Sequence, residues 1–140
     1  MVMGKVILVV DDDADDRELF RDALHETDSS AVYMSACNGQ EALDFFRQPD
    51  HIIPDFIFLD INMPRMDGRQ CLVRLRQLPR LDKVPIVIFT TLKPGYEGEE
   101  YRQLGANLYV TKPMLYAELK KIIRSIITEE WTTSRLRLNK

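Results

Sequence analysis

Carboxylates, a hydroxyl group and an ammonium group stand where short apolar runs of the sequence end. Asp11 and Asp12 follow the run at residues 6–10, and Asp60 follows the run at residues 56–59. The run at residues 84–89 leads into Thr90, and the run at residues 108–110 is followed by Thr111 and Lys112. In an open parallel α/β sheet, ligands bind where the strands end, so we expect these side chains to meet at one edge of a sheet. Such a cluster is suited to binding a cation together with an anionic group.

The acidic side chains predict a metal site. Residues 11–18 contain six acidic side chains and one basic side chain. Asp11 or Asp12 held near Asp60 without compensation would have a raised pKa, whereas a divalent cation with oxygen ligands neutralises the cluster. Mg²⁺ is the natural candidate, because it binds through one or two carboxylates and keeps water molecules that a phosphoryl oxygen can replace.

The same residues favour phosphoryl transfer. The carboxylate of Asp60 can act as a nucleophile and form an aspartyl-phosphate, and it is already in the reactive form at neutral pH. Lys112 would supply positive charge to the phosphoryl group, and Thr90 a hydrogen bond. The alternative is that acids at strand ends are solvated loop residues or helix caps. Asp13, Asp15 and Asp16 are better explained in that way, as acids at the start of a helix.

Strands and helices alternate along the chain. Runs rich in Val, Ile, Phe and Tyr predict strands at residues 6–10, 31–36, 56–59, 84–89 and 108–110. Helical spacing predicts helices at residues 14–26, 38–49, 67–79, 96–104 and 115–130, with Asn38 and Asp67 as N-terminal caps and Gly105 after the fourth. The alternation predicts a three-layer α/β domain with a parallel sheet covered on both faces.

Size and charge narrow the classes of protein. The 140 residues amount to about one domain, so we expect a single domain over residues 1–130 and a C-terminal tail over residues 131–140. A net charge of −3 without a Lys/Arg block argues against nucleic-acid binding. No apolar run is long enough for a membrane helix, and residues 1–5 do not resemble a signal peptide. We therefore expect a soluble, cytoplasmic protein that does not bind membranes.

Four stretches resemble the receiver domains of two-component response regulators, the CheY-like family. They are Val9-Val10-Asp11-Asp12, residues 58–68, Phe89-Thr90-Thr91 and residues 105–113. The resemblance covers residues 6–130, and residues 48–54 and 78–85 are also similar to stand-alone regulators that accompany phytochrome-type kinases. It implies a flavodoxin-like (βα)₅ sandwich whose five-stranded parallel sheet has the order 2-1-3-4-5.

The resemblance also implies roles for single residues. The phosphoacceptor would be Asp60, and Mg²⁺ would be bound by Asp11, Asp12, Asp60 and the backbone carbonyl of Asn62. Phosphoryl binding and switching would involve Thr90, Tyr109 and Lys112, with Tyr109 turning inward as Thr90 moves towards the phosphoryl group. The Lys112–Pro113 peptide bond matches one that is usually cis in this family.

The expected function is that of a phosphorylated switch and not of a turnover enzyme. A sensor histidine kinase would phosphorylate Asp60, and the output would be binding to a downstream protein. Alternatives are a shuttle that passes the phosphoryl group to a histidine phosphotransfer domain and a metal-dependent phosphohydrolase. A homodimer through the face of the fourth helix, fifth strand and fifth helix is one expectation, because the fifth helix carries more apolar side chains than one buried stripe requires, so that some would face outward. The alternative is that all six of these side chains lie in the core. These are Leu115, Leu119, Ile122, Ile123, Ile126 and Ile127.

Overall fold

A parallel sheet forms the centre of the protein. The computed structural model describes residues 4–63, 66–93, 95–128 and 137–138. In this part of the chain the strand order is β2-β1-β3-β4-β5-β6, which confirms the predicted order of the first five strands. The strands are β1 (Val6–Val10), β2 (Val32–Ala36), β3 (Phe56–Leu59), β4 (Ile86–Thr90), β5 (Leu108–Thr111) and β6 (Arg137–Leu138). The short β6 pairs in parallel with β5 and lies in the predicted tail, where the sequence did not predict a strand.

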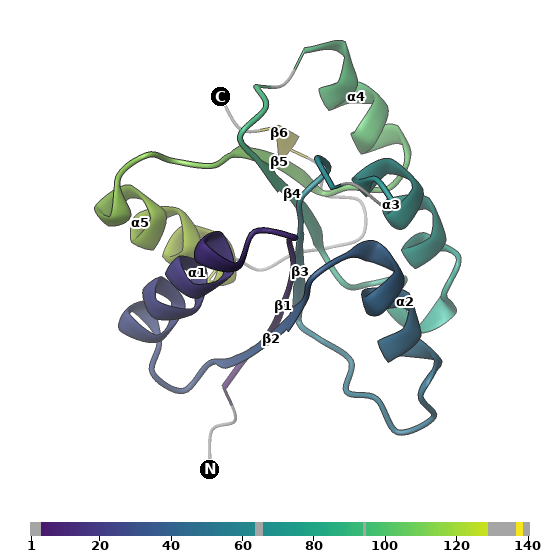
Figure 1. Ribbon diagram of the computed structural model, residues 1–140, viewed down its shortest axis with the longest axis horizontal. Coiled ribbons are helices and arrows are strands. Elements are labelled where there is room, and N and C mark those ends of the chain that lie inside the picture. The colour runs from purple at the N-terminus through teal and green to yellow at the C-terminus, as the bar shows by residue number, and fades with distance from the viewer. Residues whose placement is uncertain (1–3, 64–65, 94, 129–136, 139–140) are drawn as a thin grey trace.

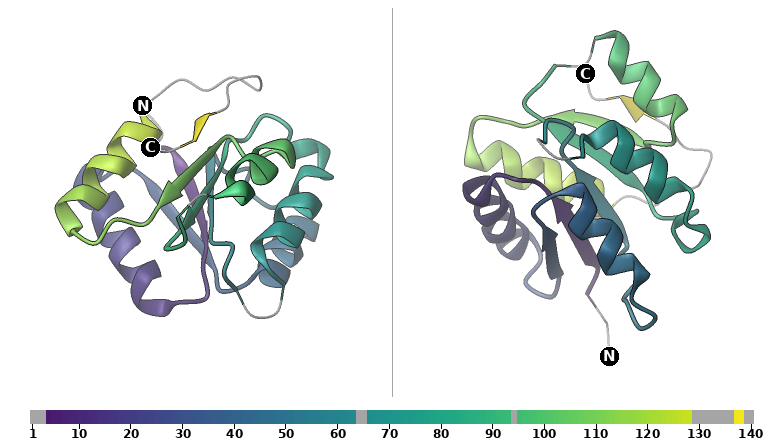
Figure 2. Two further views of the ribbon diagram at one scale, coloured as in Figure 1. Left: turned by 90° about the horizontal axis from the view of Figure 1, so that it is seen from above. Right: turned by 45° about the vertical axis from the view of Figure 1, so that its right-hand side comes forward.

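Helices cover both faces of the sheet. In Figures 1 and 2, α1 and α5 lie on one face, and α2, α3 and α4 lie on the other. Their bounds are α1 (Ala14–Thr27), α2 (Gly39–Arg47), α3 (Gly68–Arg76), the 3₁₀ turn η1 (Pro79–Leu81), α4 (Tyr96–Gln103) and α5 (Tyr116–Ile127). As predicted, Asn38 and Asp67 cap α2 and α3 by accepting hydrogen bonds from backbone amides. None of the described helices combines the length and hydropathy needed to span a lipid bilayer.

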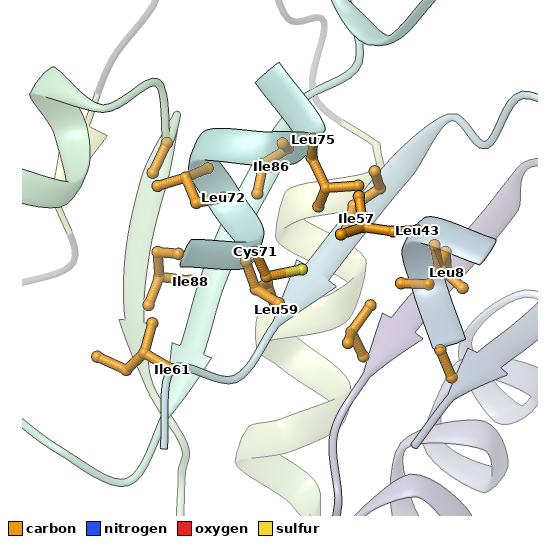
Figure 3. Close-up of a cluster of buried hydrophobic side chains, with 14 of the residues drawn as sticks. Leu8, Leu43, Ile57, Leu59, Ile61, Cys71, Leu72, Leu75, Ile86 and Ile88 are labelled. Atoms are coloured by element: carbon orange, nitrogen blue, oxygen red, sulfur yellow. The ribbon is translucent and has the colours of Figure 1, made fainter. Parts of the chain in front are cut away.

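The apolar strands divide the core into two clusters. Successive residues of a strand point to opposite faces. Ile57 therefore packs towards α2 and α3, whereas Phe58 packs towards α1 and α5. Figure 3 shows the first cluster, with Leu72 and Leu75 of α3 over the sheet. Burial on both faces explains why β1, β3 and β4 are nearly continuous apolar runs.

Most of the apolar side chains of α5 pack in the core. Leu119, Ile123, Ile126 and Ile127 are buried, and the remaining two of the predicted set are Ile122, which is half-buried, and Leu115. Leu115 is 62% exposed and lies before the first turn of the helix. The expectation that several of these side chains face outward is therefore correct only for Leu115. Residues 129–130, which the sequence assigned to the helix, lie outside the described residues.

Candidate functional site

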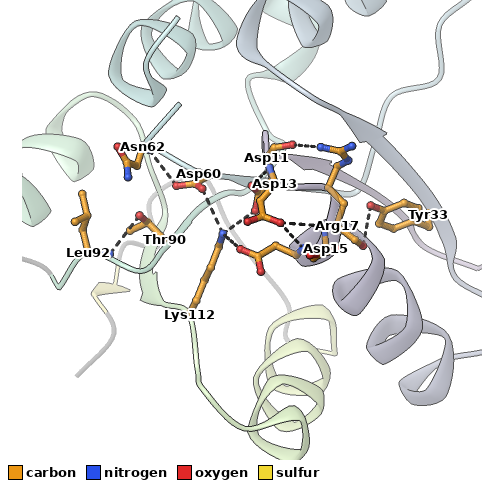
Figure 4. A network of polar contacts seen from close by, with 11 residues as sticks. Asp11, Asp13, Asp15, Arg17, Tyr33, Asp60, Asn62, Thr90, Leu92 and Lys112 are labelled. Carbon is orange, nitrogen blue, oxygen red and sulfur yellow. Dashed lines mark hydrogen bonds and ion pairs between the residues drawn. The ribbon is translucent and has the colours of Figure 1, made fainter. Parts of the chain in front are cut away.

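Asp60 lies at the edge of the sheet where the parallel strands end. It directly follows β3 and is only 7% exposed. Its backbone amide donates a hydrogen bond to the carbonyl of Val10 at 2.9 Å, which ties it to the end of β1. The amide of Asn62 donates to Asp60 Oδ1 at 3.0 Å, as Figure 4 shows. The loop after β3 therefore orients the Asp60 carboxylate towards the end of β1.

The acidic residues after β1 complete a carboxylate cluster. Asp11 is 2% exposed, and its Oδ1 accepts a hydrogen bond from the amide of Asp13 at 2.9 Å. Asp12 is exposed. Oxygen atoms of Asp11, Asp12 and Asp60 all lie within 4.8 Å of one another. The structure therefore brings together the three carboxylates that the sequence predicted to meet.

Lys112 extends from the end of β5 into this cluster. Its Nζ lies 2.7 Å from Asp11 Oδ2 and 3.3 Å from Asp60 Oδ2 (Figure 4). It also lies 2.8 Å from Asp16 Oδ2. The Lys112 amide also donates to the carbonyl of Thr90 at 2.7 Å, which joins the ends of β4 and β5. A single ammonium group thus contacts a carboxylate of α1 and the carboxylates that follow β1 and β3.

Burial and charge shift the pKa values of two of these groups. Burial raises the pKa of Asp11 above its ordinary value, although the hydrogen bond from Lys112 opposes this. Burial lowers the pKa of Lys112, but its hydrogen bonds to Asp11 and Asp16 and the charge of Asp60 outweigh burial and raise that pKa. Lys112 therefore stays charged at neutral pH.

The donor set fits a hard divalent cation. Asp11, Asp12 and Asp60 offer carboxylate oxygens within a small volume, which is the ligand chemistry that Mg²⁺ prefers. Among the described residues, only Lys112 forms ion pairs with Asp11, Asp16 and Asp60, so negative charge remains for a cation to neutralise.

The side chains of Thr90 and Tyr109 both form hydrogen bonds with the backbone of Leu92, in the short segment after β4. Thr90 is fully buried, and its Oγ1 accepts a hydrogen bond from the amide of Leu92 at 3.4 Å. The hydroxyl of Tyr109 donates to the carbonyl of Leu92 at 3.0 Å. The ring of Tyr109 is 1% exposed, so this side chain is turned inward in the structure.

The isomer of the Lys112–Pro113 peptide bond differs from the prediction. The resemblance implied a cis bond, but there is no cis peptide bond among the described residues, and this bond is trans. An X-Pro bond favours trans by only about 0.5–1 kcal/mol, so the sequence of the pair does not determine the isomer.

Asp16 and Arg17 are parts of the site that the sequence did not indicate. Asp13 caps α1 as predicted, accepting hydrogen bonds from the amides of Asp15 and Asp16. Asp16, however, also forms an ion pair with Lys112, and Arg17 Nη1 donates to the carbonyl of Asp11 at 2.7 Å. The sequence contains no signal that separates Asp16 from Asp15, because only the rotation of α1 about its axis decides which of them reaches Lys112.

The fold and this site define the class of protein. Residues 7–124 match the response regulator receiver domain family. The chain belongs to this family, whose receiver domains act as switches and bind Mg²⁺ through acidic residues.

Relatives and solved structures agree with that assignment. The chain is 30% identical to response regulator Rcp1 of Synechocystis over 126 residues, covering 87% of this chain and 86% of Rcp1. The Mn²⁺-bound structure of Rcp1 superposes with a TM-score of 0.78, covering 89% of this chain and 92% of that one. The phosphorylated cyanobacterial phytochrome response regulator RcpA also gives a TM-score of 0.78, at 29% identity, covering 88% and 91% of the two chains.

Another relative is longer than this chain. A protein-glutamate methylesterase/protein-glutamine glutaminase of Methanococcoides burtonii is 36% identical over 124 residues. The match covers 87% of this chain but only 34% of that relative, so the activity in its name is not assigned to this chain.

Proposed function

We propose that this receiver domain accepts a phosphoryl group from a sensor histidine kinase on Asp60. An oxygen of the Asp60 carboxylate would attack the phosphorus of a phosphohistidine, the P–N bond would break, and the imidazole would leave. The contact of Lys112 Nζ with Asp60 at 3.3 Å, inside a cluster of three carboxylates, carries the proposal. It places a fixed positive charge beside the oxygen that would receive the phosphoryl group.

Mg²⁺ would be held by Asp11, Asp12, Asp60 and the carbonyl of Asn62. When bound, it supplies positive charge that the phosphoryl oxygens need during transfer. Asp11 contributes a carboxylate already held in place by the amide of Asp13 and by Lys112. Asp12 is exposed, as expected for a ligand at the mouth of the site.

Phosphorylation would act by shifting a conformational equilibrium. A phosphoryl group on Asp60 offers new acceptors to Lys112 and to the hydroxyl of Thr90, which favours any state in which these groups move towards it. The backbone of Leu92 is hydrogen-bonded to both Thr90 and Tyr109, so it would transmit the change to the surface of α4 and β5. The output is then binding to a downstream protein. Passing the phosphoryl group to a histidine phosphotransfer domain is the alternative output of the same site.

A surface beside the site supports docking of the kinase. A hollow of about 130 Å³ lies next to Lys112 and is lined by Leu19 of α1, Pro113 and other residues. Leu19 is half exposed, and Met114, the residue after Pro113, is 98% exposed. Exposed apolar side chains of this kind mark interaction sites when they adjoin a functional centre.

A homodimer through α4, β5 and α5 stays a prediction with limited support. The apolar residues of α5 lie mainly in the core, and β6 pairs with the edge of β5 that such a dimer would approach.

Labelling with acetyl phosphate tests the function. The wild type with Mg²⁺ should gain the mass of one phosphoryl group in intact-mass spectrometry, and Asp60→Asn should gain none. Asp50→Asn, in an exposed loop, is the matched control and should be labelled like the wild type. Full labelling of Asp60→Asn would refute the assignment of Asp60.

A further inference from the structure

Two adjoining hollows lie over the C-terminal ends of α2 and α3. One has a volume of about 290 Å³ and extends from Phe46 and Arg47 across to Arg80. The other, of about 430 Å³, lies between Arg47 and Arg74. We call the pair of hollows, which share the lining residues Arg47 and Leu78, the depression. The helices that carry them pack side by side, as Figure 1 shows.

All titratable side chains that line this depression are basic. They are Arg47, His51, Arg74 and Arg80. Arg47 pairs with Asp44 at 3.1 Å, but no carboxylate of a described residue lies within ion-pairing distance of Arg74 or Arg80. The chain as a whole has a net charge of −3, so this local surplus of positive charge runs against its composition. We call Arg47, His51, Arg74, Leu78 and Arg80 the α2–α3 basic face.

The floor of the depression is apolar. Phe46 and Leu81 are buried beneath the first hollow, and Leu43 lies beneath the second. The ring of His51 stands edge-on to Phe46 at 5.2 Å between centroids, which holds the imidazole over the floor. An apolar centre with a charged rim is the usual composition of a protein-binding surface.

This face lies at the opposite edge of the sheet from the carboxylate cluster. Arg47 and Arg74 lie in the last turns of α2 and α3, and the other residues of the face lie in the segments that lead from these helices into β3 and β4. Asp60 follows the end of β3. Binding at the α2–α3 basic face therefore does not compete with access to Asp60.

We propose that the α2–α3 basic face binds an acidic segment of a partner protein. An aromatic or branched apolar side chain would fill the hollow above Phe46, and carboxylates would pair with Arg74 and Arg80. Guanidinium groups suit this role because they bind carboxylates through two parallel hydrogen bonds. A peptide fits better than a small ligand, since the rim residues Arg47 and Arg80 are exposed and the depression would not enclose a compact molecule.

Selection from a displayed library of short random peptides tests the proposal. We expect peptides selected on the wild type to combine Asp or Glu with Trp, Phe or Leu. The double variant Arg74→Glu, Arg80→Glu should bind them at least tenfold more weakly in fluorescence anisotropy, equivalent to about 1.4 kcal/mol. Both side chains are exposed, and circular dichroism with urea unfolding would verify that the fold is kept.

Matched variants distinguish binding at the α2–α3 basic face from a general effect of the protein's charge on peptide binding. Lys121→Glu, an exposed change on α5, and Asp60→Asn should each bind within about twofold of the wild type, because neither touches the face. Selected peptides without acidic residues, or equal binding by the double variant, would overturn the proposal. So would an equal loss in Lys121→Glu. Self-association of the wild type that the double variant abolishes would assign the face to a second copy of the chain instead.

Discussion

Thr90 and Tyr109 are connected through the backbone of one residue, Leu92. The Leu92 amide donates to Thr90 Oγ1 at 3.4 Å, and its carbonyl accepts from the Tyr109 hydroxyl at 3.0 Å. The two side chains come from neighbouring strands, β4 and β5. A displacement of the Thr90 hydroxyl away from the Leu92 amide would therefore loosen the residue whose carbonyl accepts the hydrogen bond of Tyr109.

Replacing Tyr109 by Phe should weaken this connection without preventing phosphorylation. The variant loses the hydrogen bond to the Leu92 carbonyl, worth about 1 kcal/mol of stability, but no atom of the carboxylate cluster. Acetyl phosphate should label it fully, whereas the amide shifts that beryllofluoride induces in β5 by NMR should shrink. Tyr33→Phe removes a hydroxyl that bonds to the carbonyl of Arg17 and is the control, with shifts like the wild type. Unchanged β5 shifts in Tyr109→Phe would exclude this route.

Replacing Lys112 by Met should make stability depend strongly on Mg²⁺. The Lys112 side chain is 10% exposed, and its removal leaves Asp11 and Asp60 buried without a compensating charge. We expect a loss of about 3 kcal/mol in the free energy of unfolding, largely restored by Mg²⁺. Thermal unfolding with and without Mg²⁺ measures this. Lys121→Met, on the exposed side of α5, should show no such dependence. If Mg²⁺ stabilised Lys112→Met no more than the wild type, Lys112 and the cation would not neutralise the same carboxylates.

Gly68 should not tolerate a side chain. A Cβ atom there would lie 2.6 Å from Ile61 Cγ2 and 2.7 Å from the carbonyl oxygen of Asp60, as well as against the Ile61 backbone. Gly68→Ala should therefore lower the free energy of unfolding by about 1–3 kcal/mol and slow labelling of Asp60, because the loop must shift. Urea unfolding and labelling rates measure both effects. In Gly39→Ala the new atom meets mainly the side chains of Met66 and Cys71, so its cost should be smaller.

Arg76 should contribute strongly to stability. Its guanidinium donates to the carbonyls of Gly105 at 2.9 Å and Leu81 at 2.7 Å, and to Asn107 Oδ1 at 2.8 Å. Arg76→Ala removes these three hydrogen bonds, although the Leu81 carbonyl still accepts from the amide of Val84 and Asn107 Oδ1 from that of Ile86. The change should cost about 2–4 kcal/mol in urea unfolding. Arg74→Ala, exposed on the same helix, should change stability by less than about 0.5 kcal/mol. Similar costs for both variants would show that the three contacts do not stabilise the fold.

The sequence by itself determined the first five strands, the five α-helices and the three carboxylates Asp11, Asp12 and Asp60 that meet at the site. Strands buried on both faces must be apolar along their whole length, and helices need caps such as Asn38, so both leave local patterns. Parallel strands place the residues that follow them at one edge, which is why Asp11, Asp60 and Lys112 could be brought together before the structure was known.

Only the tertiary structure decided features that depend on distant partners. The rotation of α1 selected Asp16 as a partner of Lys112, and packing on the sheet placed most of the apolar side chains of α5 in the core. The trans Lys112–Pro113 bond and the pairing of β6 with β5 have no local signal. The α2–α3 basic face joins Arg47 to Arg74 and Arg80 across two helices. Contacts between residues far apart in sequence arise from the packing of whole elements, which short-range patterns do not encode.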